Sequence, residues 1–178
     1  HFRAFNAAGH DDSFLYMYVV FTIKLLNGYR KSNTEISNPV KMKTSVSCLL
    51  FFNLLPSYDR GTASRLFEDI KYLPTRKAPD FPVKYYEFET KEQFLNQLKA
   101  IIQSSESQFT KPIIQIEAHG LSNRVGFVIG DKEESVSWKE VLPYFIEINI
   151  KAKNNMVLCM GVCHADFLII DLVKYLVD

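Results

Sequence analysis

Two stretches of this sequence decide its fold: IIQIEAHG at residues 113–120 and MVLCMGVCHAD at residues 156–166. Each begins with a run of mainly apolar residues, as expected for a strand that is buried on both faces of a parallel sheet. Each run then leads into a residue that can do chemistry, His119 in the first and Cys163 in the second. Because ligands of parallel sheets bind at the carboxyl ends of the strands, the two stretches predict one site made from both.

Around these stretches, strand patterns alternate with helix patterns along the chain. The sequence predicts strands at 45–55, 83–88, 113–118 and 156–162, a hairpin strand at 125–129, and helices at 62–73, 90–102, 137–145 and 166–177. Capping boxes open two of the helices, with Thr90 before Gln93 and Ser137 before Glu140. Alternation of this kind predicts an α/β fold with a mainly parallel sheet and helices on both faces.

The first forty residues differ from this pattern. Residues 12–28 have the pattern of a helix that ends near Asn27-Gly28, although their content of Val, Tyr and Phe leaves a strand open. Residues 29–43 are polar and indicate a linker. We therefore expect an N-terminal helical extension and linker at 1–40, followed by a core domain at 41–178.

Composition narrows the class of protein. A chain of 178 residues that is 47% hydrophobic suits one domain with a sizeable core. The net charge of +1 gives no basic excess, so we expect no nucleic-acid partner. The apolar stretch at 14–26 is too short to cross a bilayer and lacks the features of a signal peptide, so we expect no membrane association.

The cysteines indicate a reducing, cytoplasmic setting. There are three, Cys48, Cys159 and Cys163, at spacings that form no disulfide framework. No second Cys/His pair at zinc spacing accompanies the last two, so we expect no metal and no cofactor. Cys48 and Cys159 lie inside apolar runs, where cysteine usually acts as a small hydrophobic residue.

Cys163 and His119 together form a candidate nucleophile and base. A cysteine reacts as the thiolate, which an imidazole at the end of a neighbouring strand can generate. The backbone N–H groups of Gly120 and Cys163 are candidates for an oxyanion hole, and the amino end of the last helix would help to stabilise a thiolate. His164 is a neighbour rather than the base, and Asp166 is a weak candidate for a charge in a substrate pocket, with a helix cap as the expected role.

The order of strand, His-Gly, hairpin, capped helix, strand and Cys resembles the caspase-like clan CD of cysteine peptidases, which includes caspases, metacaspases, separases and CHAT-domain peptidases. The resemblance is closest to the CHAT group and rests on three stretches: IIQIEAHG at 113–120, VGFVIGDKEESVSWKEVL at 125–142 and NNMVLCMGVCHAD at 154–166. It covers residues 44–170, and the separation of 44 residues between His119 and Cys163 fits the clan. The resemblance implies a three-layer α/β/α sandwich.

The resemblance also implies roles for single residues. His119 would be the proton-transfer partner, Cys163 the nucleophile, and Gly120 and Cys163 the oxyanion donors. Metacaspases carry an Asp two residues before the nucleophile that holds a basic substrate side chain, and this sequence has Gly161 there. Arg60 lies in the loop where caspases carry a substrate-binding Arg, without a motif that would assign it that role.

The resemblance implies a regulated cysteine endopeptidase that acts on a protein substrate, in bacterial antiviral defence or programmed cell death. Members of the clan continue beyond the cysteine with further strands that wall the substrate groove, and 15 residues follow Cys163 here. We therefore expect an activating partner chain, or the remainder of a larger polypeptide, to complete the groove.

Two other interpretations stay open at this point. The first is a catalytically silent caspase-like module that binds a regulator or another protein. The second is an unrelated α/β signalling domain of flavodoxin-like topology, in which His119 and Cys163 would lie far apart. No Gly-rich phosphate loop follows the first predicted strand, so a nucleotide site is not expected.

Overall fold

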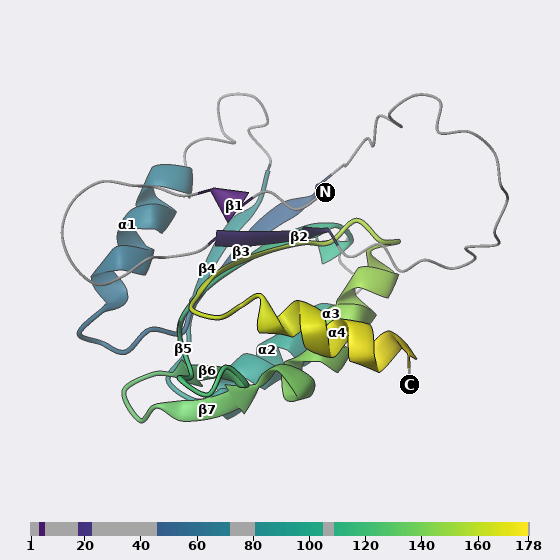
Figure 1. The fold of residues 1–178 in the computed structure, drawn as a ribbon. Coiled ribbons are helices and arrows are strands. Elements are labelled where there is room, and N and C mark those ends of the chain that lie inside the picture. Colours follow the sequence, from purple (N-terminus) through teal and green to yellow (C-terminus); the bar gives the residue numbers. More distant parts are fainter. Residues whose placement is uncertain (1–3, 6–17, 23–45, 72–80, 105–108, 178) are drawn as a thin grey trace, which may run out of the picture.

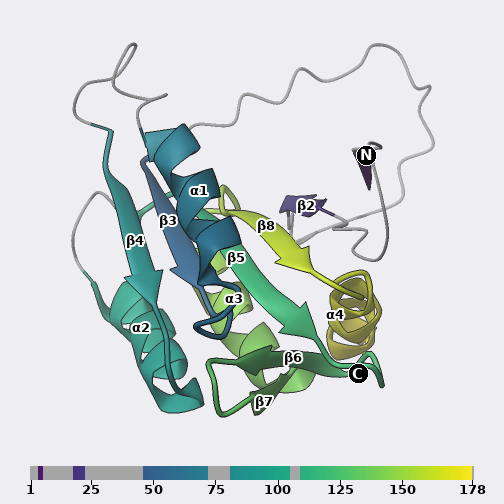
Figure 2. The same ribbon diagram turned by 90° about the vertical axis from the view of Figure 1, so that its left-hand side faces the viewer.

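Four neighbouring strands of the sheet run parallel to one another (Figures 1 and 2). The structure is a computed structural model that describes residues 4–5, 18–22, 46–71, 81–104 and 109–177. In spatial order the parallel strands are β8 (Val157–Val162), β5 (Pro112–Gly120), β3 (Cys48–Asn53) and, at the edge, β4 (Val83–Glu87). Every residue of β3 is buried, which explains why this strand needs an almost wholly apolar sequence. The prediction of a mainly parallel α/β sheet is confirmed.

Two further strands extend the sheet beyond β8. Strand β2 (Tyr18–Thr22) pairs antiparallel with β8, and β1 (Ala4–Phe5) pairs antiparallel with β2. The helix predicted over 12–28 is therefore wrong at Tyr18–Thr22, because the open edge of β8 offers backbone groups to a segment rich in Val, Tyr and Phe. The rest of that helix and the linker lie outside the described residues, and the boundary near residue 40 stays a prediction.

Helices cover both faces of the sheet. Helix α1 (Arg60–Lys71) packs on one face, over a small cluster that joins Phe51 and Leu55 to Phe67. Helices α2 (Lys91–Gln103), α3 (Trp138–Lys151) and α4 (Phe167–Val177) lie on the other face. The four predicted helices are thus confirmed, with ends shifted by a few residues.

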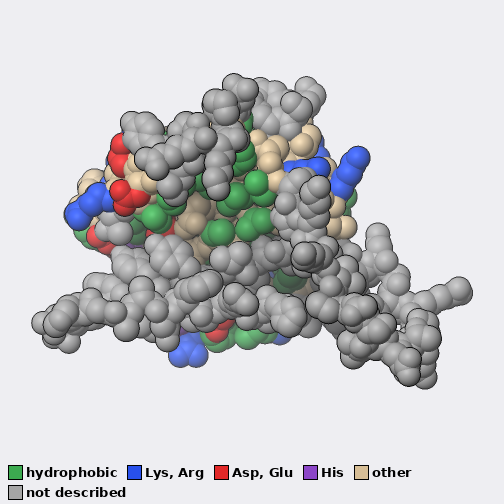
Figure 3. Space-filling view, turned by 90° about the horizontal axis from the view of Figure 1, so that it is seen from above, with side chains coloured by type: hydrophobic (Ala, Val, Ile, Leu, Met, Phe, Trp, Pro, Cys, Tyr) green, Lys and Arg blue, Asp and Glu red, His purple; other side chains and the backbone are tan. Residues whose placement is uncertain are grey.

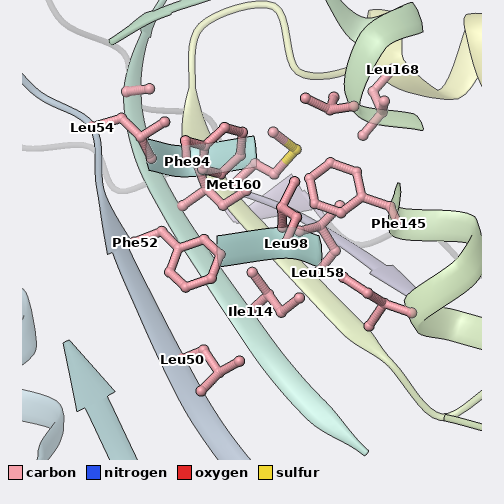
Figure 4. Close-up of a cluster of buried hydrophobic side chains, with 14 of the residues drawn as sticks. Leu50, Phe52, Leu54, Phe94, Leu98, Ile114, Phe145, Leu158, Met160 and Leu168 are labelled. Atoms are coloured by element: carbon pink, nitrogen blue, oxygen red, sulfur yellow. The ribbon is translucent and has the colours of Figure 1, made fainter. Parts of the chain in front are cut away.

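The larger core lies between the sheet and the three helices (Figure 4). Figure 4 shows side chains from β3, β5 and β8 pointing toward those from α2, α3 and α4; those labelled are Leu50, Phe52, Leu54, Ile114, Leu158, Met160, Phe94, Leu98, Phe145 and Leu168. The alternate residues of β3 point to the α1 face, as the period of two of a strand requires. The same strand therefore supplies both cores.

Two of these helices begin at the capping boxes that the sequence predicted. The Thr90 hydroxyl accepts a hydrogen bond from the Gln93 N–H, and the Gln93 side chain accepts one from the Thr90 N–H. Ser137 and Glu140 form the same reciprocal pair at the start of α3. Of the helices in the described ranges, none has the length and apolarity needed to cross a membrane.

The chain leaves β3 and β5 toward opposite faces of the sheet. After β3 it enters α1 on one face, whereas after β5 it forms the hairpin β6 (Gly126–Ile129) and β7 (Glu134–Ser137) and enters α3 on the other face. In open parallel sheets, such a divergence between neighbouring strands leaves a crevice at their carboxyl ends. The topology therefore places the expected site at the ends of β3, β5 and β8.

Figure 3 shows the molecule from above Figure 1. On the coloured part of this face, hydrophobic side chains gather toward the middle, and both acidic and basic side chains lie around them. The mixture of charges agrees with the nearly neutral composition of the chain.

Removal of the Thr90 hydroxyl tests the contribution of the α2 capping box. We expect Thr90→Ala to lower the free energy of unfolding by about 1 kcal/mol, because the Gln93 N–H loses its acceptor. Thr90→Ser keeps the hydroxyl and serves as the control, with a change of less than about 0.5 kcal/mol. Urea denaturation followed by circular dichroism measures both, and equal values for the two variants would contradict the role of the cap.

Candidate functional site

His119 and Cys163 follow the last paired residues of two adjacent parallel strands. The register of β5 and β8 pairs Glu117 with Gly161 and Ala118 with Val162; His119 is the next residue of β5, and Cys163 is the first residue after β8. His119 does not follow its strand, as the sequence suggested, but belongs to it. Strand β5 continues through Gly120 because β6 pairs with its end.

The two strand ends are in direct contact through Gly120. A Cβ atom at this position would lie 2.1 Å from the Cys163 carbonyl oxygen and 3.0 Å from the Cys163 Cβ. Such distances leave no room for a side chain, so the close approach of the two backbones requires glycine. The order β4-β3-β5-β8 occurs in flavodoxin-like sheets as well, so the contact does not decide between that interpretation and a caspase-like one. The proposed use of the Gly120 and Cys163 N–H groups as oxyanion donors stays a prediction.

Cys163 begins a tight turn between β8 and α4. The Ala165 N–H donates to the Val162 carbonyl at 3.3 Å, and the Phe167 N–H donates to the His164 carbonyl at 3.1 Å. His164 has a φ of 63°, a left-handed conformation that reverses the chain direction directly after the cysteine. The turn keeps Cys163 half-buried at the end of the strand, and α4 begins four residues later, at Phe167.

An acidic residue that the sequence analysis did not select lies against the histidine. The Oδ2 atom of Asp59 is 3.0 Å from Nε2 of His119, and both side chains are partly shielded from solvent, at 35% and 26% exposed. Asp59 is at the end of the loop that joins β3 to α1. The signal that could have found it is its position after a buried parallel strand, the same rule that selected His119 and Cys163.

Hydrogen bonds hold the loop of Asp59 in place. The Leu54 N–H donates to the Glu117 carbonyl and the Leu54 carbonyl accepts from Gly130, both at 2.9 Å. The Ser57 N–H donates to Oδ1 of Asp131 at 2.5 Å, a bond that lowers the pKa of the Asp131 carboxyl. The Asp59 N–H closes a turn on the Pro56 carbonyl at 2.9 Å. The loop is therefore tied both to β5 and to the β6–β7 hairpin.

Arg60 also fixes this loop, because its side chain is bonded to three other groups of the protein. Its Nε donates to the Leu55 carbonyl at 3.4 Å, and its guanidinium forms ion pairs with Glu89 and, at 3.8 Å, with Glu87. The hydrogen bond with Glu89 is the main cause that raises the pKa of Arg60. These contacts give Arg60 a structural role at the start of α1, and no substrate-binding role is assigned to it.

A buried carboxyl lies two residues before His119 on the same face of the sheet. Glu117 is 1% exposed, and Gln115 Nε2 donates to its Oε1 at 2.6 Å. Its Oε2 would lie 2.2 Å from a Cβ at position 161, so the carboxyl fills the space that Gly161 leaves empty. Burial raises the pKa of Glu117 to about 7, although the bond from Gln115 opposes the shift. The sequence signal for this group was an acidic residue inside an apolar run.

The other two cysteines have the surroundings of structural residues. Burial raises the pKa of Cys48 to about 11, and burial together with the charge of Glu117 raises that of Cys159 to about 11. Neither is thus activated as a thiolate. Asp166 directly precedes α4, and its backbone carbonyl accepts a hydrogen bond from the Ile169 N–H at 3.1 Å, a position that fits the start of a helix.

Metal-binding groups and pockets were compared with the positions of these residues. Within the described ranges, no group of three or more His, Cys, Asp and Glu side chains is arranged to hold a metal ion. An open hollow of about 340 Å³ lies over α2 and β7, lined by residues such as Lys91, Leu95 and Lys99 and by none of the candidate site residues.

Comparisons with known proteins identify neither a family nor a function for the chain. No protein-family model matches the chain, and no curated protein sequence matches it.

Substitution of Gly120 tests the contact between the strand ends. We expect Gly120→Ala to lower the free energy of unfolding by about 2 kcal/mol or more, because the new methyl group overlaps the Cys163 carbonyl. The matched control is Gly61→Ala on α1, where the nearest atom to a Cβ is Arg65 Nη2 at 3.9 Å. This control should change the free energy of unfolding by less than about 0.5 kcal/mol, because Gly61 lies in the first turn of α1 and a methyl group there meets no close atom. Equal effects in urea denaturation would refute the contact.

Glu117 should make stability fall as pH rises. Its folded-state pKa of about 7 lies above the ordinary value of 4.5, so its contribution is full below pH 4.5 and is lost as pH rises through 7. We expect Glu117→Gln to match the wild type near pH 4.5 and to exceed it by on the order of 2 kcal/mol at pH 8. Urea denaturation across pH 4.5–8 measures this, with exposed Glu147→Gln as the control. Parallel curves for wild type and Glu117→Gln would contradict the prediction.

Proposed function

We propose that this chain is a cysteine endopeptidase of the caspase-like, CHAT-domain type, and that its sheet and helices form a caspase-like α/β/α sandwich. The observation that supports the proposal most is the contact between Gly120 and Cys163 at the ends of adjacent parallel strands. The contact supports the proposal because it brings the backbone next to His119 against the backbone of Cys163, and acyl transfer to a cysteine needs a base and oxyanion donors near the thiol.

The reaction would proceed in two steps. His119 takes the proton of the Cys163 thiol, and the thiolate sulfur attacks the carbonyl carbon of a peptide bond. The N–H groups of Gly120 and Cys163 stabilise the oxyanion of the tetrahedral intermediate. The C–N bond then breaks, and the imidazolium of His119 gives its proton to the leaving amine. In the second step His119 deprotonates a water that attacks the thioester, which releases the acid and restores the thiol.

The wider role is also proposed from the resemblance. The enzyme would act in the cytoplasm on a protein substrate, in bacterial antiviral defence or programmed cell death, and an activating partner or further polypeptide would complete the substrate groove. Asp166 remains a weak candidate for a charge in the substrate pocket, because it lies in the turn that carries Cys163. No cofactor takes part in the proposed mechanism.

A peptidyl acyloxymethyl ketone tests the proposal, because an activated thiolate displaces its carboxylate and is alkylated to a thioether. We expect labelling at Cys163 and not at Cys48 or Cys159, whose thiols are held protonated by burial. Cys163→Ala should abolish labelling and His119→Ala should slow it by about 100-fold or more, whereas Cys159→Ala should label at the wild-type rate. Mass spectrometry of tryptic peptides locates and quantifies the label.

The competing function is a catalytically silent module that binds a regulatory protein. Absence of Cys163 labelling, or labelling unaffected by His119→Ala, would favour this alternative and overturn the peptidase proposal.

A further inference from the structure

We propose that Asp59 is the positioning residue of the site, and that it holds the His119 imidazole with its proton on Nε2. Nδ1 is then the nitrogen that exchanges protons with Cys163 and with the leaving amine. This inference rests on the proposed function for its catalytic consequence, but the pairing of Asp59 with His119 can be tested without any reaction.

Nε2 of His119 and Oδ2 of Asp59 are 3.0 Å apart, a distance at which a ring N–H can donate to a carboxylate oxygen. An ionised carboxylate is only an acceptor, so the ring nitrogen that faces it must carry a proton. In neutral imidazole the other nitrogen is then an acceptor, and Asp59 thereby selects the tautomer in which Nδ1 is free to take a proton.

The positions of Asp59 and Cys163 in the fold support the proposal that Asp59 orients the His119 ring toward Cys163. Asp59 comes from the loop after β3, and Cys163 comes from the end of β8, on the two sides of the strand that carries His119. The strand that carries His119 thus lies between the strand before Asp59 and the strand before Cys163, and the imidazole is in contact with Asp59. When an acid, a base and a nucleophile lie in this order, the acid orients the base and the base takes the proton of the nucleophile.

The surroundings of Asp59 leave its carboxylate directed to the histidine. The neighbouring cation, Arg60, is paired with Glu87 and Glu89. The buried acid on β5, Glu117, is bonded to Gln115 and lies over Gly161. Among the residues that the structure describes, Asp59 is the acidic residue that forms an ion pair with the imidazole.

The loop restricts the motion of Asp59, which is what a positioning residue requires. Its backbone is held by the turn to Pro56, and the preceding residues are bonded to β5 and to the β6–β7 hairpin through Leu54 and Ser57. A carboxylate fixed in this way orients the ring before substrate binds and stabilises the imidazolium that forms in the reaction. Loss of such an orienting group costs activity without loss of substrate binding.

The first experiment measures the tautomer directly. Ring ¹⁵N chemical shifts of the histidines in the Cys163→Ala protein, with His119 assigned by its loss in His119→Gln, report which nitrogen is protonated. We expect the Nε2–H form in this protein, a shift toward the Nδ1–H form on Asp59→Asn, and recovery on Asp59→Glu. Asp69→Asn, which removes an exposed carboxylate from α1, should leave the signals unchanged. An unchanged His119 tautomer in Asp59→Asn would overturn the proposal.

The second experiment measures the catalytic consequence on the peptidyl acyloxymethyl ketone. We expect Asp59→Asn to slow the maximal rate of Cys163 labelling by about 10- to 1000-fold with little change in half-saturating probe concentration, and Asp69→Asn to have no effect. A merely structural role would instead change both quantities and would not be rescued by Asp59→Glu. If the tautomer responds to Asp59 but no labelling occurs at Cys163, the pairing stands and the proposed peptidase function fails.

Discussion

At the ends of β5 and β8, the backbone of Gly120 lies against the carbonyl group of Cys163 so closely that a methyl group would not fit between them. This approach is possible because the two strands are parallel neighbours in register through Ala118 and Val162. The β6–β7 hairpin keeps β5 extended to this point, and the turn after Val162 holds Cys163 beside it. The ladder between β5 and β8 sets the spacing of the strands, and this contact places the turn of Cys163 against the end of β5 beyond the last pair.

The rest of the fold supports this edge of the sheet from two directions. On the side of α2, α3 and α4, a continuous apolar core fixes the positions of β3, β5 and β8 (Figure 4). On the side of α1, the polar residues Asn53, Gln115 and Glu117 of β3 and β5 are buried, and Asn53 is paired with Glu117. Gln115 donates a hydrogen bond to the Glu117 side chain, and the Glu117 carbonyl accepts one from the Leu54 N–H. The second bond ties the loop of Asp59 to β5. The face of α2, α3 and α4 therefore holds the strands in place through an apolar core, and the face of α1 carries the acidic groups near His119.

Much of this could be predicted from local patterns. The buried strands at 45–55, 83–88, 113–118 and 156–162 and the two capping boxes depend on residues close together in the sequence, so periodicity and side-chain chemistry were enough. The helix expected over 12–28 failed at Tyr18–Thr22, since the conformation of that segment depends on the edge of β8, which is distant in the sequence. The role of Asp59 was missed for a similar reason: 60 residues separate it from His119, and only the spatial order of β3 and β5 makes them neighbours.

By itself, the sequence determined that the chain forms an α/β sheet and that His119 and Cys163 stand at strand ends, because apolar runs followed by polar residues specify both. Tertiary structure alone decided which strands are adjacent, that Gly120 is needed for backbone contact with Cys163, and that Asp59 and Glu117 lie near the same edge. The physical reason is that strand pairing is a non-local choice. Hydrogen bonds between backbones carry no residue identity, so the order of strands follows from the packing of the whole core and not from any one segment.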